Sequence, residues 1–485
     1  MREIAVLSVA SEIFPLIKTG GLADVVGALP AALTHEQVAV STLLPGYPTV
    51  MAKLETAEPA RDYANLFGGA ARVLAGRAAK LDLFVVDAPH LYARPGNPYL
   101  DADGKDYADN AERFAALARV GADVAKDGLG PFQPAALHAH DWQAALAPAF
   151  LHYDGGRRPP TVVTIHNIAF QGHFYQSTLA ALGLPDHAMS IDGVEYFGGI
   201  GFLKAGLQFA DKITTVSPTY AEEILTPEFG MALDGLLRKR AKDVVGIVNG
   251  VDEAIWNPAR DPAIPQPFNA LRLDLRSRNK DALQRRLKIA ESPEAPLFGV
   301  ISRLTSQKGL DLVVDVVPFL VEQGAQLALL GSGDKSLEAA FTLAAAEHPA
   351  RVGCQLGYDE TLAHLIQAGS DFLLVPSRFE PCGLTQLCAL RYGAPPIVSR
   401  VGGLADTVID ANAAALTAGV ATGLQFSPPT APALRHAVER ALALYGNPRA
   451  LRRTRLNGLR ADVSWRSSAK QYADLYRSLL EDASP

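Results

Sequence analysis

Short apolar segments alternate with amphipathic segments along most of the chain. Residues 4–10 form an apolar run with the length and branching of a strand that is buried on both faces. Residues 21–33 then repeat apolar side chains at the i, i+3, i+4, i+7 spacing of a helix with one buried face. This alternation predicts βαβ units and parallel sheets. Further apolar runs of the strand type occur at 80–88, 135–141, 160–167, 211–217, 243–250, 296–303, 325–333, 372–377 and 394–400.

A proline-rich stretch, residues 256–269, interrupts the alternation and predicts a linker without regular structure. We therefore expect an α/β protein with two doubly wound, Rossmann-like domains that face each other across a deep cleft. The predicted limits are 1–248 for the first domain and 249–460 for the second. Residues 461–485 are predicted to form a helix that crosses back to the first domain.

The composition restricts the class of protein and of partner. The chain has 485 residues, of which 48% are hydrophobic, and a formal net charge of -6. This charge gives no basic surface for nucleic acid, so small solutes or neutral polymers are the expected partners. Three cysteines are too few for a secreted disulfide framework and fit a reducing cytoplasm. Neither a signal peptide nor a membrane-spanning segment is expected.

The segment between the first predicted strand and the first predicted helix contains candidate chemistry. Lys18 precedes Gly20 and Gly21, where the helix is expected to begin with unpaired backbone N–H groups. Such a loop suits a phosphate, because it combines an ammonium group with a positive helix end. The glycines could equally make only a turn, with Lys18 in solvent. The spacing matches neither the Walker loop nor the dinucleotide fingerprint, so this stretch alone leaves both interpretations open.

Polar residues gather where the predicted strands end. Each one alone could be a turn residue, a hydrogen-bonded core residue or half of a surface ion pair. Together they predict a ligand site, because the carboxyl ends of parallel strands lie at one edge of a sheet. The residues are Lys18, Asp141, Trp142, His166, Asn167, Asn249, Arg303, Lys308 and Glu380.

Two segments of the second half favour a phosphorylated ligand. Arg303 and Lys308 flank one strand exit and are close enough in sequence to bind one diphosphate, with a planar fork and a compact charge. Glu380 is followed by Cys382 and Gly383 and then by a predicted helix, whose first turn includes Leu384 and Thr385. The start of that helix offers backbone N–H groups to an anion.

Six motifs of the chain resemble those of the bacterial glycogen synthases and plant starch synthases, and the resemblance runs essentially from end to end. It implies the two-domain, B-type glycosyltransferase architecture. It also implies transfer of glucose from ADP-glucose to the nonreducing end of an α-1,4-glucan in glycogen biosynthesis, with release of ADP and without a metal or another cofactor. The motifs are K-T-G-G-L-A-D-V at 18–25, H-D-W-Q at 140–143, H-N-I-A-F-Q-G at 166–172, N-G-V-D at 249–252, R-L-T-S-Q-K-G at 303–309 and E-P-C-G-L-T-Q at 380–386.

The resemblance assigns the donor diphosphate to three cations, Lys18, Arg303 and Lys308. It also implies that the loop at Gly20 and Gly21 lets the backbone approach the donor and its sugar. These glycines and cations are therefore expected to bind one ligand.

The donor glucose is assigned to a second group of residues by the same resemblance. His166 and Asn249 are expected to contact its hydroxyl groups. Asp141 is expected near the reacting sugar, and Glu380 is expected to bind glucose hydroxyls from the opposite wall. Tyr358 is the candidate for stacking on the adenine. The backbone amides of Gly383, Leu384 and Thr385 are expected to support the distal phosphate, and the other expected substrate-binding residues are Glu12, Asp24, Trp142, Asn167 and Cys382.

One position departs from the wider pattern of retaining glycosyltransferases. Many of these enzymes have a second glutamate eight residues after the first, where this chain has Cys388. The synthase branch that the chain resembles also lacks that glutamate. The resemblance implies retention of the anomeric configuration without an evident carboxylate nucleophile, and therefore front-face substitution, in which the leaving phosphate helps to deprotonate the acceptor hydroxyl.

Other classes of protein remain open at the level of single residues. The H-A-H-D sequence at 138–141 has the His-x-His spacing of metal-dependent hydrolases, with His166 as a third ligand. A glucan-binding or regulatory module without catalysis is a second alternative, but it would not need Arg303, Lys308 and Glu380. Among enzymes, the alternatives are a transferase that uses UDP-glucose and a phosphorylase, which would need a pyridoxal-binding lysine.

Overall fold

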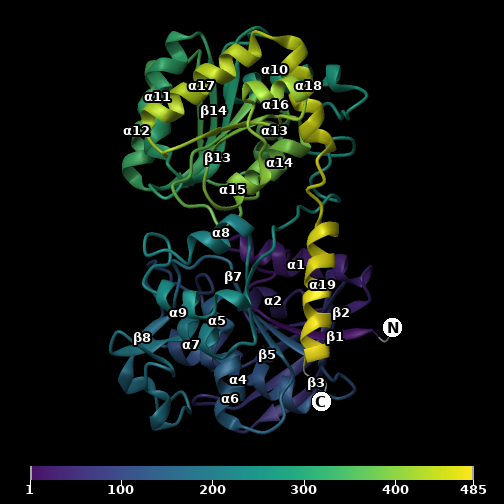
Figure 1. Cartoon of the computed structure of the whole chain (residues 1–485), viewed down its shortest axis with the longest axis vertical. Coiled ribbons are helices and arrows are strands. Elements are labelled where there is room, and N and C mark those ends of the chain that lie inside the picture. The colour runs from purple at the N-terminus through teal and green to yellow at the C-terminus, as the bar shows by residue number, and fades with distance from the viewer. Residues whose placement is uncertain (1–2, 483–485) are drawn as a thin grey trace. The chain divides into compact units, whose positions relative to one another are not determined.

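The structure is a computed structural model that describes residues 3–482. The chain divides into two compact units (Figure 1). Unit 1 comprises Met1–Asn249 and Trp465–Pro485, and unit 2 comprises Gly250–Ser464. Each unit is built around its own β-sheet with flanking helices. No helix within residues 3–482 has both the length and the apolar character that crossing a bilayer requires.

Unit 1 contains a nine-stranded sheet with the order β12-β11-β7-β6-β1-β2-β5-β4-β3. Neighbouring strands from β12 to β5 pair in parallel, as the alternation predicts. The strands are β1 (Ile4–Val9), β2 (Val38–Pro45), β3 (Thr56–Tyr63), β4 (Ala71–Ala78), β5 (Leu81–Asp87), β6 (Ala136–His140), β7 (Thr161–Ile165), β11 (Lys212–Thr215) and β12 (Val244–Gly246).

One edge of this sheet departs from the predicted parallel pairing. Strand β4 pairs antiparallel with both β5 and β3. Ala79 and Lys80, which both have positive φ, connect β4 to β5 in a two-residue turn. A connection this short permits only antiparallel pairing.

Helices and a small antiparallel sheet complete unit 1. The small sheet has the order β8-β10-β9, with β8 (His173–Tyr175), β9 (Glu195–Tyr196) and β10 (Gly199–Gly201). The helices are α1 (Gly21–Thr34), α2 (Pro48–Met51), α3 (Pro89–Tyr92), α4 (Asn110–Asp127), α5 (Asp141–Ala144), α6 (Leu146–Asp154), α7 (Phe202–Phe209), α8 (Pro218–Glu223), α9 (Asp234–Lys239) and α19 (Trp465–Asp482), and short 3-10 turns occupy Gln176–Thr178, Asp186–Ala188 and Ala241–Asp243.

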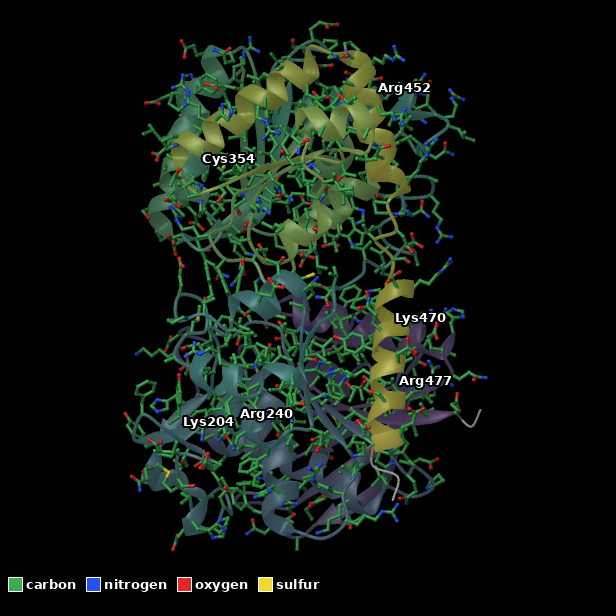
Figure 2. All side chains as sticks on the ribbon, in the orientation of Figure 1. Lys204, Arg240, Cys354, Arg452, Lys470 and Arg477 are labelled. Carbon is green, nitrogen blue, oxygen red and sulfur yellow. The ribbon has the colours of Figure 1, made fainter. Side chains whose placement is uncertain are left out.

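Helix α19 packs on the same core as α1 within unit 1 (Figure 1). Its residues Tyr472 and Tyr476 are buried in one cluster with Val25 and Leu29 of α1. Arg477, labelled in Figure 2, donates a 2.7 Å hydrogen bond to a backbone carbonyl, that of Glu36. The last helix of the chain is therefore part of the first sheet's packing.

Unit 2 contains a six-stranded sheet with the order β15-β14-β13-β16-β17-β18, in which every pair is parallel. The strands are β13 (Leu297–Leu304), β14 (Gln326–Gly333), β15 (Val352–Leu356), β16 (Phe372–Val375), β17 (Pro396–Ser399) and β18 (Leu424–Phe426).

Helices cover both faces of the unit 2 sheet. Successive residues of a strand point to opposite faces, so the residues of one strand pack in two different core clusters. Phe298 and Val300 of β13 pack in one core cluster with residues of α11 and α17, whereas Leu297 packs in another with residues of α10 and α13. The helices are α10 (Ser277–Leu287), α11 (Leu310–Glu322), α12 (Lys335–Glu347), α13 (Glu360–Gly369), α14 (Thr385–Arg391), α15 (Gly402–Thr407), α16 (Ala413–Ala418), α17 (Ala431–Tyr445) and α18 (Pro448–Arg460), and a 3-10 turn occupies Leu273–Arg276.

The proline-rich stretch 256–269 has no regular structure, as predicted, but its assignment as a linker is wrong. It lies inside unit 2, and the chain passes between units at Asn249–Gly250 and Ser464–Trp465. Ile264 and Phe268 are buried in a core cluster of that unit. The prolines prevent helix and strand formation, but their apolar neighbours still pack.

Candidate active site

In unit 2 the carboxyl ends of β13 and β16 lie next to each other, because these strands pair in parallel. Lys308 follows β13, and Glu380 follows β16. The Nζ atom of Lys308 lies 2.8 and 2.6 Å from Oε1 and Oε2 of Glu380. The Glu380 side chain is 9% exposed and that of Lys308 is 20% exposed. Two residues that lie 72 positions apart in sequence thus form a largely buried ion pair.

Two further contacts hold the loops that carry this ion pair. Gly309 has a φ of +67°, and a Cβ atom there would lie 2.0 Å from the carbonyl oxygen of Pro376. Arg378 donates to the Ser306 carbonyl at 2.7 Å and forms a two-pronged ion pair with Asp311 at 2.7 and 2.6 Å. The loop after β13 is therefore tied to the loop after β16.

Arg303 shares a small pocket with the ion pair. The pocket has a volume of about 170 Å³, and its lining includes Arg303, Lys308, Glu380 and Thr385. Among residues 3–482, the Arg303 guanidinium has no hydrogen-bond or ion-pair partner and is exposed. One cation of the pocket is therefore neutralised by a carboxylate, and the other is available to an anionic ligand.

Sequence reasoning missed Ser377, which also lines this pocket. Its hydroxyl donates a 2.8 Å hydrogen bond to Glu380 Oε2, and the residue is 1% exposed. The Ser377 carbonyl in turn accepts a hydrogen bond from the hydroxyl of Ser399. Its position three residues before Glu380 was the available signal.

The residues after Glu380 form a tight turn into α14. Gly383 has a φ of +76°, and the Gln386 amide donates to the carbonyls of Cys382 and Gly383 at 2.9 and 2.8 Å. Cys382 is 5% exposed, and Leu384 packs against a core cluster. Of this group, Thr385 reaches the lining of the pocket.

Tyr358 lies apart from this pocket. It belongs to the loop between β15 and α13 and is 82% exposed. Its hydroxyl donates to the carboxylate of Glu360. The Tyr358 ring is thus exposed on the surface of unit 2.

In unit 1 the loop before α1 carries Lys18, which is 39% exposed and pairs with Asp24 at 2.8 Å. A Cβ atom at Gly20 or Gly21 would meet no heavy atom within 4 Å. Packing within unit 1 therefore gives no reason for glycine at either position.

Glu12 holds the loop before α1 through hydrogen bonds to its carboxylate. Its Oε1 accepts a 2.6 Å hydrogen bond from the Thr19 hydroxyl and another from the hydroxyl of Tyr99. Its Oε2 accepts the backbone N–H of Thr19. Glu12 is 2% exposed, so its carboxylate is used in positioning the residue that follows Lys18. Sequence reasoning missed Tyr99, for which no motif gave a signal.

Asp141 and His166 lie at the ends of the neighbouring strands β6 and β7. Asp141 has a φ of +54°, a conformation that is costly for a residue other than glycine. Its Oδ1 accepts the backbone N–H of His166 at 2.7 Å and that of Asn167 at 3.4 Å. Burial raises the pKa of Asp141 to about 7, against the effect of these hydrogen bonds. The carboxyl group can therefore exchange a proton near neutral pH.

His166 is 9% exposed, and burial lowers its pKa to about 3. Its Nε2 lies 3.0 Å from Nδ1 of His140. His138, the other member of the His-x-His pair, has both nitrogens in hydrogen bonds, to Tyr476 at 2.7 Å and to Thr164 at 2.5 Å. No nitrogen of His138 is left for a metal, so the ligand set of the hydrolase alternative is not present. The described residues contain no group of three metal-binding side chains.

The predicted residues Asn249, Asn167 and Trp142 differ in the contacts that their side chains make. Asn249 is 7% exposed, and its Oδ1 is buried without a hydrogen-bond partner in the described part of the chain. Asn167 accepts the backbone N–H of Ala169 at 3.0 Å. Trp142 packs edge-on against Phe114, with ring centroids 4.9 Å apart. Asn249 alone of these three has a buried side-chain oxygen without a hydrogen-bond partner among the described residues.

Family models match both units. The model described as starch synthase catalytic domain matches residues 5–239, and the model described as glycosyl transferases group 1 matches residues 282–455. A glycogen synthase of Rhodopseudomonas palustris is 58% identical over 99% of this chain and 100% of its own length. A glycogen synthase of Methylocella silvestris is also 58% identical, with the same coverage.

Solved structures show the same architecture. The catalytic domain of starch synthase IV from Arabidopsis thaliana, bound to ADP and acarbose, has a TM-score of 0.88 and 30% identity, and the match covers 99% of this chain and 100% of that one. A sucrose-phosphate synthase from Thermosynechococcus elongatus, with a TM-score of 0.60 and 19% identity over 100% of both chains, shares the fold. The expected fold class, the B-type glycosyltransferase fold with two Rossmann-like domains, is confirmed. The chain belongs to the glycogen synthase and starch synthase family of glycosyltransferases.

Proposed function

We propose that this chain is a glycogen synthase, which transfers glucose from ADP-glucose to the nonreducing end of an α-1,4-glucan with retention of configuration and releases ADP. Its relatives of 58% identity are glycogen synthases, and the starch synthase of similar structure is bound to ADP and acarbose. The partners of the proposed reaction are therefore a nucleotide sugar and a glucan. The proposed compartment is the cytoplasm, which suits the free thiols of Cys354, Cys382 and Cys388.

The observation that carries the proposal is the charge arrangement of the unit 2 pocket. Arg303 has no internal partner within the described residues, whereas Lys308 is paired with Glu380. The Arg303 fork suits a phosphate of the donor. Lys308 supplies a second cation, which is held in place by Glu380 before the donor binds. We assign both residues to the donor diphosphate.

Lys18 is the third cation assigned to the diphosphate. Its partner Asp24 is 26% exposed, so their ion pair is weakened by solvent and can give way to a more highly charged phosphate. The open space at Gly20 and Gly21 leaves room for a ligand next to the backbone. We assign Glu12 to holding this loop, because its carboxylate is already engaged by Thr19.

The sugar is assigned to residues at the strand ends. The unpartnered Oδ1 of Asn249 can accept a glucose hydroxyl, which would satisfy a buried acceptor. His166 is neutral at the working pH, because burial lowers its pKa to about 3, and a neutral imidazole can exchange hydrogen bonds with hydroxyl groups. We assign Asp141, which holds the His166 backbone, to a position near the reacting sugar. Glu380 accepts glucose hydroxyls while Lys308 and Ser377 fix its orientation.

The chemistry requires stabilisation of a leaving diphosphate. Negative charge grows on the phosphate as the bond to the anomeric carbon breaks, and Arg303, Lys308 and Lys18 are the groups assigned to meet it. Glu380 is held by its ion pair and by Ser377, so we assign it to binding and not to nucleophilic attack. Retention then follows from front-face substitution, in which the acceptor hydroxyl transfers its proton to the departing phosphate oxygen while the new glycosidic bond forms. The remaining assigned substrate contacts are Asn167, Trp142, Tyr358, Cys382, Gly383, Leu384 and Thr385.

A donor competition assay tests the proposal. The purified chain is incubated with glycogen and with ADP-glucose, UDP-glucose or both, and release of ADP and UDP is measured together with glucose incorporation. We expect ADP release that equals glucose incorporation and exceeds UDP release by at least about tenfold. Equal use of UDP-glucose would contradict the donor assignment. Release of ADP without extension of the glucan would contradict transferase activity.

A further inference from the structure

Three buried histidines form a continuous row in unit 1. His138 and His140 lie two residues apart on β6 and therefore point to the same face of the sheet. Both are 1% exposed, and their ring centroids are 4.1 Å apart. The His140 Nδ1 lies 3.0 Å from Nε2 of His166, at the end of the neighbouring strand β7. Of these three imidazoles, only His166 is assigned to the substrate.

The far end of the row is fixed by the last helix of the chain. The Tyr476 hydroxyl of α19 lies 2.7 Å from His138 Nδ1, and the Thr164 hydroxyl of β7 lies 2.5 Å from His138 Nε2. The His138 ring is thereby prevented from rotating. Since His140 packs against this ring on one side and contacts His166 on the other, its own orientation is also restricted.

The contact between the two imidazoles restricts where their protons lie. Burial lowers the pKa of His166 to about 3 and that of His140 well below its ordinary value, so both rings are neutral near pH 7. A neutral imidazole carries one N–H. A hydrogen bond between His140 Nδ1 and His166 Nε2 requires a proton on one of these nitrogens and a lone pair on the other. The state of His166 Nε2 then fixes whether its Nδ1 donates or accepts.

We propose that His140 is a positioning residue for His166: its Nδ1 occupies the Nε2 edge of His166, so that His166 offers a ligand only Nδ1, in a single tautomer. A free imidazole would distribute its proton between both nitrogens and would rotate. Fixing both properties before the substrate binds removes that cost from turnover. The effect on turnover rests on the proposed contact between His166 and the donor sugar, whereas the tautomer does not.

The matched variants are His140→Asn, His140→Leu and Tyr476→Phe. An asparagine amide can place a hydrogen-bonding atom near the position of Nδ1, and leucine removes it while keeping an apolar side chain of similar size. Tyr476→Phe removes one of the two hydroxyls that contact His138, but the Thr164 hydroxyl still holds that ring, and the contact between His140 and His166 stays intact. It serves as the control for a merely structural effect.

The first measurement is the nitrogen NMR spectrum of protein labelled with ¹⁵N-histidine, with His166 assigned through His166→Asn. In the native chain and in Tyr476→Phe, we expect one protonated and one unprotonated ring nitrogen for His166 between pH 6 and 8. In His140→Leu, we expect the two shifts to move towards an average. Averaged shifts for His166 in the native chain would overturn the proposal even if His140→Leu does not fold.

The second measurement is steady-state kinetics with ADP-glucose and glycogen. Removing the partner that orients a metal-ligating imidazole costs about 10- to 100-fold, and we expect a kcat loss of the same order in His140→Leu with little change in KM for glycogen. His140→Asn is expected to keep kcat within about threefold. A folded His140→Leu with native kcat or an unchanged His166 spectrum would overturn the proposal. Native activity of His166→Asn would instead overturn the role of His166 in the proposed function.

Discussion

The ammonium of Lys308 lies within 2.8 Å of both carboxylate oxygens of Glu380, whereas Arg303, which lines the same pocket, has no such partner within residues 3–482. The pocket therefore holds one neutralised and one available cation. Because Glu380 and Lys308 are largely buried, loss of either leaves an uncompensated charge in place. Substitution in this ion pair and substitution of Arg303 are thus expected to have different effects.

Glu380→Gln is expected to lower kcat while ADP binds at least as tightly as in the native chain. The amide keeps the shape of the side chain but frees Lys308 to attract phosphate. Loss of the carboxylate as an acceptor for glucose hydroxyls is expected to raise the barrier by about 2.7–4 kcal/mol, or about 10² to 10³ in kcat. Calorimetric titration with ADP and steady-state kinetics measure the two effects.

The matched control is Glu291→Gln, which breaks the exposed ion pair with Arg285 in the same unit. Exposed pairs contribute little, so neither ADP affinity nor kcat is expected to change. Weaker binding of ADP to Glu380→Gln would contradict the idea that Lys308 serves the phosphate.

Arg303→Ala is expected to weaken ADP binding without lowering the melting temperature. The guanidinium contacts no polar partner among the described residues, so its removal leaves no internal group unsatisfied. A charged hydrogen bond contributes about 1.5–3 kcal/mol, which corresponds to about 10- to 150-fold in Kd.

Arg378→Ala provides the contrast, because Arg378 binds Asp311 and the Ser306 carbonyl. Its loss is expected to lower the melting temperature measurably. If Arg303→Ala melts earlier by as much as Arg378→Ala, the arginine has an internal role and the assignment to the donor is wrong.

Tyr99→Phe is expected to loosen the loop that carries Lys18. The substitution removes the hydroxyl that donates to Glu12, which in turn holds the backbone N–H of Thr19. One hydrogen bond contributes about 1 kcal/mol, so amide exchange in residues 13–20 is expected to accelerate about fivefold, with a similar loss of kcat. Hydrogen-exchange mass spectrometry and kinetics report these changes. Tyr63→Phe, which removes a 3.0 Å hydrogen bond to Asp123 elsewhere in unit 1, should alter neither.

Sequence patterns predict most of the strands, including the edge strand β12, but they miss β2 and β4 inside the first sheet and β3, β15 and β18 at sheet edges. Strands β1, β6 and β13 are apolar throughout most of their length, so their runs stand out. Strand β3 is almost entirely exposed and has no apolar run, and β18 has three residues. Both lie at sheet edges, where a strand has a pairing neighbour on one side alone.

The candidate site shows the same division. The proximity of the loops that carry Lys308 and Glu380 follows from parallel strands, which the alternation predicts. Their direct ion pair could not be inferred, because it depends on how two loops are held by Gly309 and Arg378. Tyr99 lies 87 residues from Glu12, and no periodicity links them.

Asp141→Asn is expected to change the pH dependence of unfolding. Burial raises the pKa of Asp141 from 3.8 to about 7 in the folded chain. Between these two pKa values the folded state binds a proton that the unfolded state has released. The free energy of unfolding therefore falls as pH rises through this window, and the contribution of Asp141 no longer changes with pH above it. From pH 5 to pH 8, this amounts to about 3 kcal/mol. Urea unfolding of both proteins is therefore expected to show the native chain losing about that much stability relative to Asp141→Asn.

Asp211→Asn is the control for this experiment. Burial of Asp211 acts to raise its pKa, but hydrogen bonds from Arg158 and Thr161 hold the pKa below its ordinary value. Asp211 is therefore ionised in both states above pH 5, and the difference between this variant and the native chain should not vary from pH 5 to pH 8. The neutral histidines near Asp141 are present in every protein compared, so their titration cancels in the differences. An Asp141→Asn difference that stays constant with pH would show that Asp141 is ionised at pH 5 in the folded chain and would remove it as a group that exchanges protons near neutrality.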